Sequence, residues 1–120
     1  MTRPLLKNFL VNKLRRASYQ WPPRRQAIAN ARVERGKYQC NICEGKEFGP
    51  KDIQLDHIYP VVDEEVGFID FNTYIDRLFC DASGFQVLCR PCHATKTFFE
   101  QEIRKQVKRE NKKEDEDDDI

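Results

Sequence analysis

Several kinds of residue or segment are scarce in this chain, and each scarcity narrows what the protein can be. No apolar run is long enough to cross a membrane or to form the apolar part of a signal peptide. We therefore expect an intracellular, cytoplasmic protein with no membrane partner. Only 39% of the 120 residues are hydrophobic and 34% are charged. Such a chain forms one domain with a modest core, which a bound metal would help to stabilise.

Cysteine is limited to five residues, an odd number that fits poorly with a framework of disulfides. Four of them form two Cys-x-x-Cys pairs, Cys40 with Cys43 and Cys89 with Cys92. Two such pairs can close one tetrahedral site, so we predict a structural Zn²⁺ held by all four thiolates. Cys80 is left over at the end of an apolar run, where a small buried hydrophobic residue is expected.

The chain has only two histidines, and both lie beside potential partners. His57 follows Asp56 within the 45 residues that separate the cysteine pairs, and His93 directly follows Cys92. A zinc ion that ties the two ends of this loop could bring the three residues together. His57 titrates near neutrality and can accept a proton from water, while Asp56 and His93 suit one Mg²⁺, Mn²⁺ or other divalent ion.

Each of these residues also has a plainer interpretation. His57 could be a satisfied core histidine, and Asp56 could cap a turn or a helix. His93 could be a spare zinc ligand, although four cysteines already complete a tetrahedron. Both histidines nevertheless lie where a small catalytic centre requires them, which favours the catalytic interpretation.

The order of these motifs resembles that of the HNH endonucleases, which have the ββα-metal (His-Me finger) fold. The resemblance rests on Cys-x-x-Cys, Asp-His-Ile-x-Pro, and Gln-Val-Leu-Cys-x-x-Cys-His-x-x-Lys, read in that order along the chain. The segments 14–24 and 74–80 further resemble a bacteriophage-encoded branch of the family. The likeness covers roughly residues 14 to 100 and implies His57 as the general base, with Asp56 and His93 on the catalytic metal.

One position departs from the family pattern. The family has an asparagine two residues before the Gln of the Gln-x-Leu-Cys segment, and this chain has Gly84 there. The role of that asparagine cannot be transferred to Asn72, the nearest upstream asparagine, because it does not match the motif position. The third protein ligand of the catalytic metal is therefore not assigned by the resemblance.

Acidic residues are almost absent from the first 40 residues, which carry ten Lys or Arg and the single acid Glu34. Basic side chains interleaved with Tyr19 and Trp21 indicate contact with nucleic acid, and a solvated helix is the plainer alternative. The predicted phosphate contacts are Arg15, Arg16, Arg24 and Arg25, with Lys96 one turn beyond His93.

Hydrophobic periodicity predicts a mixed α+β fold with an amino-terminal helical extension. Helices are expected over residues 5–19, from 23 to 35 with Gly36 as the stop, over about 71–78 with Asp70 or Asn72 as cap, and from about 91. Strands are expected at 53–55 and 85–88. Because neighbouring strand residues point to opposite faces, we expect an irregular strand end where Asp56 and His57 both turn inward.

Three segments follow from these patterns. Residues 1–36 form a basic helical arm that packs on the core or clamps DNA, and 37–108 form an HNH nuclease core with zinc knuckles. Residues 109–120 form a charged tail, expected to be disordered because like charges repel.

The resulting hypothesis is a monomeric, phage-encoded, metal-dependent DNA endonuclease of low sequence specificity, acting in the host cytoplasm by nicking or by double-strand cleavage. The alternative is a zinc-stabilised nucleic-acid- or protein-binding module whose nuclease site has decayed. Packaging beside terminase, mobility of its own gene and breakdown of host DNA are the biological roles left open.

Overall fold

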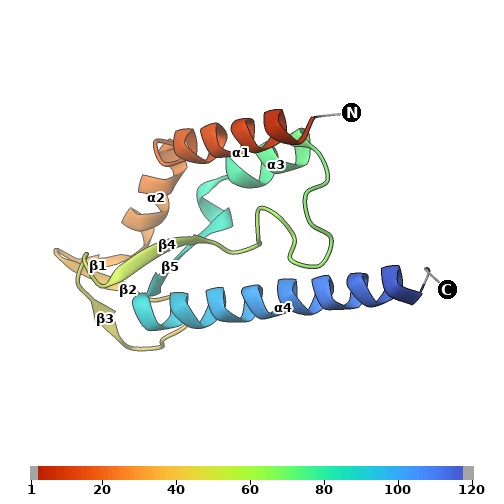
Figure 1. Ribbon diagram of the computed structural model, residues 1–120. Helices are drawn as coiled ribbons and strands as arrows, with labels where there is room; N and C mark the ends of the chain where they lie inside the picture. The colour runs from red at the N-terminus through yellow and green to blue at the C-terminus, as the bar shows by residue number, and fades with distance from the viewer. Residues whose placement is uncertain (1–2, 118–120) are drawn as a thin grey trace.

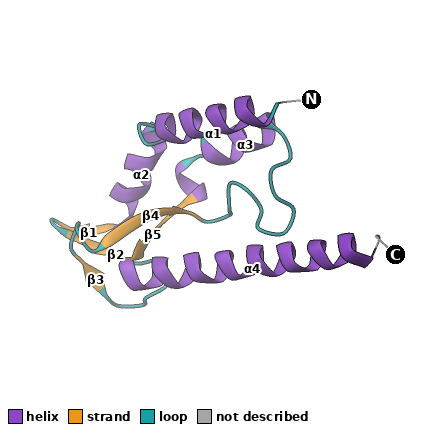
Figure 2. Cartoon of the chain, in the orientation of Figure 1, coloured by secondary structure: helices purple, strands orange, loops and turns teal. Residues whose placement is uncertain are grey.

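The computed structural model describes residues 3–117 and shows a mixed α+β fold (Figures 1 and 2). The elements, in chain order, are α1 (Pro4–Ser18), α2 (Pro22–Ala31), β1 (Arg32–Glu34), β2 (Lys37–Gln39), β3 (Glu47–Phe48), β4 (Ile53–His57), α3 (Phe71–Leu78), the 3₁₀ helix η1 (Ala82–Gly84), β5 (Phe85–Cys89) and α4 (Arg90–Asp117). In Figure 1, α1 and α4 lie on opposite sides of the molecule, with the loop from β4 to α3 between them. Within residues 3–117, no helix has the length and apolar character needed to cross a membrane.

The first two helices are separated by a break at Trp21, as the proline pattern predicted. Both begin with proline at the first helical position, where its missing N–H costs no hydrogen bond. Trp21 attaches this break to the rest of the fold. Its indole Nε1 donates to the carbonyl of Cys80 at 2.7 Å, and its ring packs edge-on against Phe79. α1 also packs against α3, where the Tyr74 hydroxyl donates to the Val11 carbonyl at 3.3 Å.

The predicted end of the second helix was wrong by four residues. α2 ends at Ala31, and the next residues form β1 of an antiparallel hairpin with β2. Gly36 provides the turn of that hairpin, with a positive φ of 75°, instead of ending a helix. β-branched Val33 also favours the extended conformation. The boundary expected at residue 36 between arm and core therefore falls inside one hairpin.

Two small antiparallel sheets organise the remainder. One has the order β1-β2-β3, and the other pairs β4 with β5. In the second sheet Leu55 lies opposite Val87 and Asp56 opposite Gln86. Both predicted strands are confirmed, although each is longer than expected. The irregular strand end predicted at Asp56 is not found, because regular pairing continues to His57, which lies opposite Phe85.

The buried core lies where β5 meets the first cysteine pair and the helices. Leu88 and Cys40 are almost fully buried, and Cys43, Phe48 and Cys92 pack against their cluster. The backbone N–H of Asn41 donates to the Val87 carbonyl at 2.8 Å and so attaches the first pair to β5. A second buried group, Tyr74 and Leu78, belongs to α3. The Asp70 side chain caps this helix by accepting from the Thr73 N–H at 2.7 Å, which confirms the predicted cap.

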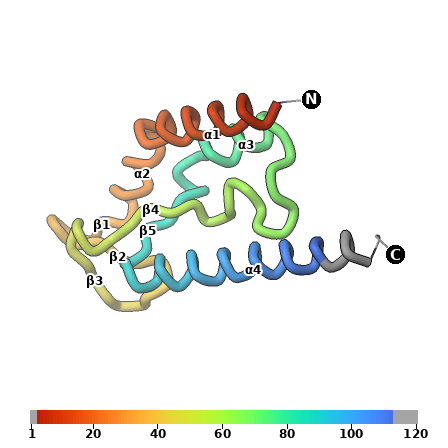
Figure 3. The backbone as a smooth tube through the Cα atoms, viewed as in Figure 1, coloured from red at the N-terminus to blue at the C-terminus, as the bar shows by residue number. Residues whose placement is uncertain are grey.

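The last helix is longer than the charge pattern predicted. α4 continues from residue 109 to Asp117, in the segment expected to be disordered, while residues 118–120 lie outside the described part of the chain (Figure 1). Figure 3 traces the backbone of the preceding part of α4, on the side of the molecule opposite α1. Contacts between side chains one turn apart stabilise α4 over residues 102–110. Lys105 pairs with Glu102 at 3.5 Å, and Gln106 donates to Glu110 at 3.1 Å. Such contacts offset the repulsion between like charges.

Candidate functional site

The four paired cysteines lie together and could hold a metal such as zinc. Their sulfur atoms are all within 4.8 Å of one another, and Cys43 Sγ is 3.8 Å from Cys89 Sγ and 3.5 Å from Cys92 Sγ. Zinc–sulfur bonds of about 2.3 Å in a tetrahedron place sulfurs about 3.8 Å apart, so the cluster fits this ion. Cys80 does not belong to the cluster, as predicted.

The electrostatics of the cluster also favour a cation at its centre. Burial raises the pKa of Cys40, but hydrogen bonds from backbone N–H groups, those of Cys43 and Cys89 first, outweigh it and lower the pKa to about 6. Hydrogen bonds with Cys89 and Cys43 raise the pKa of Cys92 to about 12. One thiolate therefore forms readily while another is suppressed. A divalent ion between the sulfurs would allow all four to ionise.

A second potential metal site lies beside the cysteine cluster, between β4 and the first turn of α4. Asp56 Oδ1 and His93 Nε2 are 3.9 Å apart. Bonds from Mg²⁺ to its ligands measure about 2.0–2.1 Å, so both atoms can reach one ion. Among the described residues, the only group of three or more acidic, histidine or cysteine donors gathered closely enough for a metal is the cysteine cluster. Asp56 and His93 are thus a two-ligand set.

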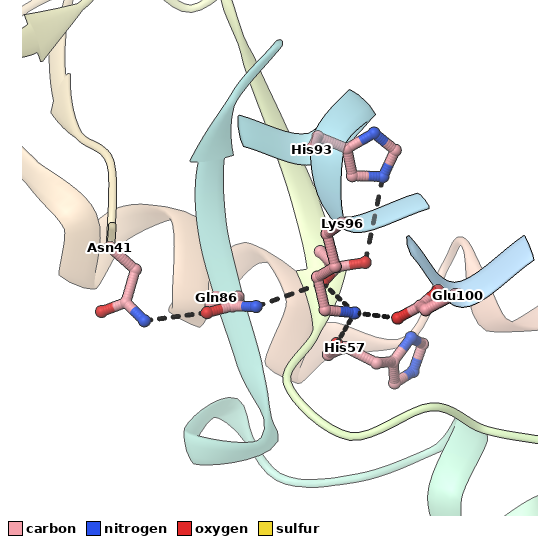
Figure 4. Close-up of polar contacts among 7 residues, drawn as sticks. Asn41, His57, Gln86, His93, Lys96 and Glu100 are labelled. Atoms are coloured by element: carbon pink, nitrogen blue, oxygen red, sulfur yellow. Dashed lines mark hydrogen bonds and ion pairs between the residues drawn. The ribbon is translucent and has the colours of Figure 1, made fainter. Parts of the chain in front are cut away.

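The other oxygen of Asp56 is already engaged. Lys96 Nζ lies 2.9 Å from Asp56 Oδ2, and Gln86 Nε2 donates to the same oxygen at 3.2 Å. The Lys96 ammonium also pairs with Glu100 and donates to the His57 carbonyl at 3.3 Å (Figure 4). Lys96 is therefore held inside the site by three acceptors, although the sequence suggested a free phosphate contact.

His57 is held so that one ring nitrogen is available. Its Nε2 lies 3.1 Å from the Leu78 carbonyl, which can only accept, so in the neutral ring Nε2 carries the proton and Nδ1 keeps its lone pair. The ring packs 4.6 Å from that of Phe85. Burial lowers the pKa of His57 below its ordinary value, which favours the neutral ring near pH 7.

One cavity of about 490 Å³ contains all three predicted catalytic residues, Asp56, His57 and His93. The side chains of Asp56 and His57 project to opposite faces of β4, yet both line this cavity because β4 ends at His57. Arg15, Arg24 and Lys96 also line it, whereas the exposed Arg16 and Arg25 do not. Of the predicted phosphate contacts, the structure thus brings three to the site.

Three further residues of the site were missed by sequence reasoning. Glu100 and Arg104 line the cavity from α4, and Gln86 contacts Asp56 from β5. Helical spacing could have found the first two, because residues 93, 96, 100 and 104 share one helix face. The contact of Gln86 with Asp56 could be predicted only from the pairing register of β4 and β5.

Gly84, where the resemblance to HNH endonucleases would place an asparagine, has no room for a side chain. A Cβ atom there would lie 2.6 Å from Cys80 Sγ and 3.0 Å from Cys80 Cβ. The Gly84 carbonyl accepts from the Ile58 N–H at 2.9 Å, which holds this turn beside the end of β4. An asparagine therefore cannot occupy this position without displacement of Cys80.

The chain is thus a mixed α+β protein with a four-cysteine cluster able to bind a metal such as zinc. Comparison with models of protein families, with curated proteins and with solved structures found no match. The function has to be inferred from the site itself.

We expect about one tightly held zinc ion per chain, because the four sulfurs match one tetrahedral site. Elemental analysis of extensively dialysed protein measures this content. Cys40→Ser should lose the zinc and unfold the surrounding region, since metal binding and folding are linked in small sites. Cys80→Ser, which changes a cysteine outside the cluster, should keep its zinc. Zinc-free native protein would contradict the assignment.

Gly84→Ala should lower the free energy of unfolding by about 1–3 kcal/mol, because the new methyl group meets Cys80. Thermal or urea unfolding measures the difference. Gly49→Ala is the matched control, since a Cβ there lies 3.6 Å from its nearest neighbour, Asp52 Oδ2. Adding Cys80→Ala to Gly84→Ala should recover part of the loss. Equal stabilities of the two glycine variants would show that the turn relaxes freely.

Proposed function

We propose that this protein is a metal-dependent HNH endonuclease that hydrolyses phosphodiester bonds in DNA. The observation that carries the proposal is the meeting of Asp56, His57 and His93 in one cavity that arginines also line. The two histidines come from segments 36 residues apart in the chain. If each histidine had only a structural role, the two would not need to line the same cavity as the Asp56 carboxylate.

The order of the supporting elements agrees with this proposal. β4 carries Asp56 and His57, β5 pairs with β4, and α4 follows with His93 in its first turn. Two antiparallel strands followed by a helix are the arrangement that the resemblance to the ββα-metal nucleases implies. α3 and η1 lie between the two strands as an insertion.

Each part of the reaction has a group of this chain to perform it. His57 Nδ1 accepts a proton from the attacking water, while the Leu78 carbonyl fixes the ring through Nε2–H. The oxygen of that water bonds to phosphorus as the bond from phosphorus to the leaving 3′ oxygen breaks. A divalent ion on Asp56 and His93, when bound, would supply Lewis-acid stabilisation of the negative charge on that oxygen.

The arginines of the cavity suit the negatively charged substrate. Arg24 lies over the rings of Tyr19 and Phe85, with its guanidinium carbon 5.3 Å from each ring centre. Arg15 on α1 lines the same cavity. These two side chains can neutralise phosphates on either side of the scissile bond, while Arg16 and Arg25 remain exposed for contacts farther along the backbone of the DNA.

A second candidate is a zinc-stabilised binding module whose nuclease site has decayed. Two observations favour it: Lys96 already occupies one oxygen of Asp56, and Gly84 replaces the family asparagine. Neither observation removes His57, Asp56 or His93 from the cavity, so the enzyme remains the better account. For the enzyme, packaging beside terminase, gene mobility and host DNA breakdown are proposals of equal standing.

His57→Ala should lower the rate of plasmid cleavage ~10²–10⁴-fold, because general-base catalysis contributes about this factor. Its zinc content and affinity for DNA should stay near those of the wild type. His93→Ala should also lose activity, but added Mn²⁺ should restore part of it, because this variant lacks a metal ligand. If the His57→Ala protein does not fold, His57→Gln replaces it in the experiment, because glutamine keeps a polar side chain at this half-buried position.

Two results would contradict the enzyme. One is a folded His57 variant that cleaves DNA at the wild-type rate. The other is a pure wild-type protein that cleaves nothing with Mg²⁺, Mn²⁺, Ni²⁺ or Zn²⁺, in which case the binding module becomes the better account.

Replacing Arg15 and Arg24 together by glutamine should weaken DNA binding and reduce its salt dependence. Each lost phosphate contact lowers the slope of log K against log salt by roughly 0.9. Fluorescence anisotropy at several salt concentrations measures this slope. The matched control replaces Lys108 and Arg109 by glutamine, which removes the same charge from exposed positions of α4 outside the cavity and should change the slope less. Equal losses in both double variants would show that the arginines act through overall charge alone.

A further inference from the structure

A chain of side-chain amides connects the first cysteine pair to Asp56. Asn41, which directly follows Cys40, donates from Nδ2 to Gln86 Oε1 at 2.8 Å. Gln86 in turn donates from Nε2 to Asp56 Oδ2 at 3.2 Å. Figure 4 shows Asn41 beside Gln86, with a dashed line for the contact between them and a second dashed line leaving Gln86 on its other side.

The direction of this chain follows from chemistry. A carboxylate only accepts, so Gln86 must turn its NH₂ group toward Asp56. Its carbonyl oxygen then faces away, where it needs a donor. Asn41 supplies that donor, and its backbone is held in turn by the bond from its own N–H to the Val87 carbonyl at 2.8 Å.

The result is a defined orientation of the Asp56 carboxylate. Gln86 and Lys96 both contact Oδ2, and Oδ1 is left facing His93 Nε2 at 3.9 Å. Lys96 is itself shared with Glu100, so Gln86 is the donor that belongs to Asp56 alone. A carboxylate without these donors could rotate and turn either oxygen away from His93.

We propose that Asn41 and Gln86 are positioning residues, which fix the Asp56 carboxylate for divalent-ion binding and so couple the cysteine cluster to the catalytic metal. This inference rests on the proposed function, because it assumes that Asp56 and His93 hold an ion. The inference also explains why the first Cys-x-x-Cys pair lies next to β5, where Asn41 can reach Gln86. The cysteine cluster also positions Asn41, the first donor in the series of hydrogen bonds that ends on Asp56.

The test measures Mn²⁺ affinity directly, by calorimetry or electron paramagnetic resonance on zinc-loaded protein. Gln86→Met keeps the shape but removes both bonds, and should weaken Mn²⁺ binding about tenfold, the usual effect of losing one hydrogen bond to a charged group. Asn41→Ala should weaken it less, because Gln86 remains. Zinc content and unfolding temperature are measured in parallel to exclude a general loss of structure.

Asn41→Asp tests the direction of the chain. An aspartate at 41 accepts, so Gln86 should reverse its amide and turn its carbonyl oxygen toward Asp56. Mn²⁺ binding should then fall further than in Asn41→Ala. Asn30→Asp is the matched control, since it makes the same chemical change on α2, outside the chain of amides, and should bind Mn²⁺ like the wild type.

The double variant Asn41→Ala with Gln86→Met completes the experiment. If Asn41 acts through Gln86, the double variant should bind Mn²⁺ no more weakly than Gln86→Met alone. Additive losses, or wild-type affinity in zinc-loaded Gln86→Met, would overturn the positioning role while leaving the enzyme intact. A wild-type protein that binds no Mn²⁺ through Asp56, judged against Asp56→Asn, would overturn this role and the proposed catalytic metal site together.

Discussion

The pairing of β4 with β5 is the constraint on which the rest of the structure depends. It places Asp56 opposite Gln86 and His57 opposite Phe85, and it brings Cys89 to the end of β5 beside the first cysteine pair. α4 begins at the next residue, so the strand register also determines where His93 meets Asp56. A slip of one residue would turn Asp56 away from α4 and separate it from its partners.

The charged side chains around this pairing form two groups. Asp56 and Glu100 form an acidic centre, with the Lys96 ammonium between them. Arg15 and Arg24 line the same cavity and come from the two amino-terminal helices. The arm that the sequence separated from the core thus completes the cavity, and its two possible roles, packing on the core and contacting DNA, are compatible. In the proposed enzyme Asp56 holds an ion while the two arginines hold phosphate.

Much of the site could be predicted from local patterns. Cys-x-x-Cys spacing is enough to predict a metal-binding cluster, because a two-residue turn lets both thiolates face one ion. Helical periodicity predicted α1 and α3, and Asp70 was recognised as a cap. The hairpin after α2 was missed because the strand preference of the single residue Val33 is a weak signal, and tertiary pairing with β2 decided the conformation. The strand end at Asp56 was expected to be irregular because neighbouring strand residues point to opposite faces. The sequence does not reveal that the cavity reaches both residues at the end of β4.

The sequence by itself determined which chemical groups are present, their spacing within each motif and the cysteines that can share a metal. Only the tertiary structure decided which groups meet across long separations. It placed Gln86 against Asp56, brought Lys96 to the same carboxylate, and attached Trp21 to the carbonyl of Cys80. The physical reason is that propensity and periodicity act over a few residues, whereas strand register and close packing join segments that are far apart in the chain.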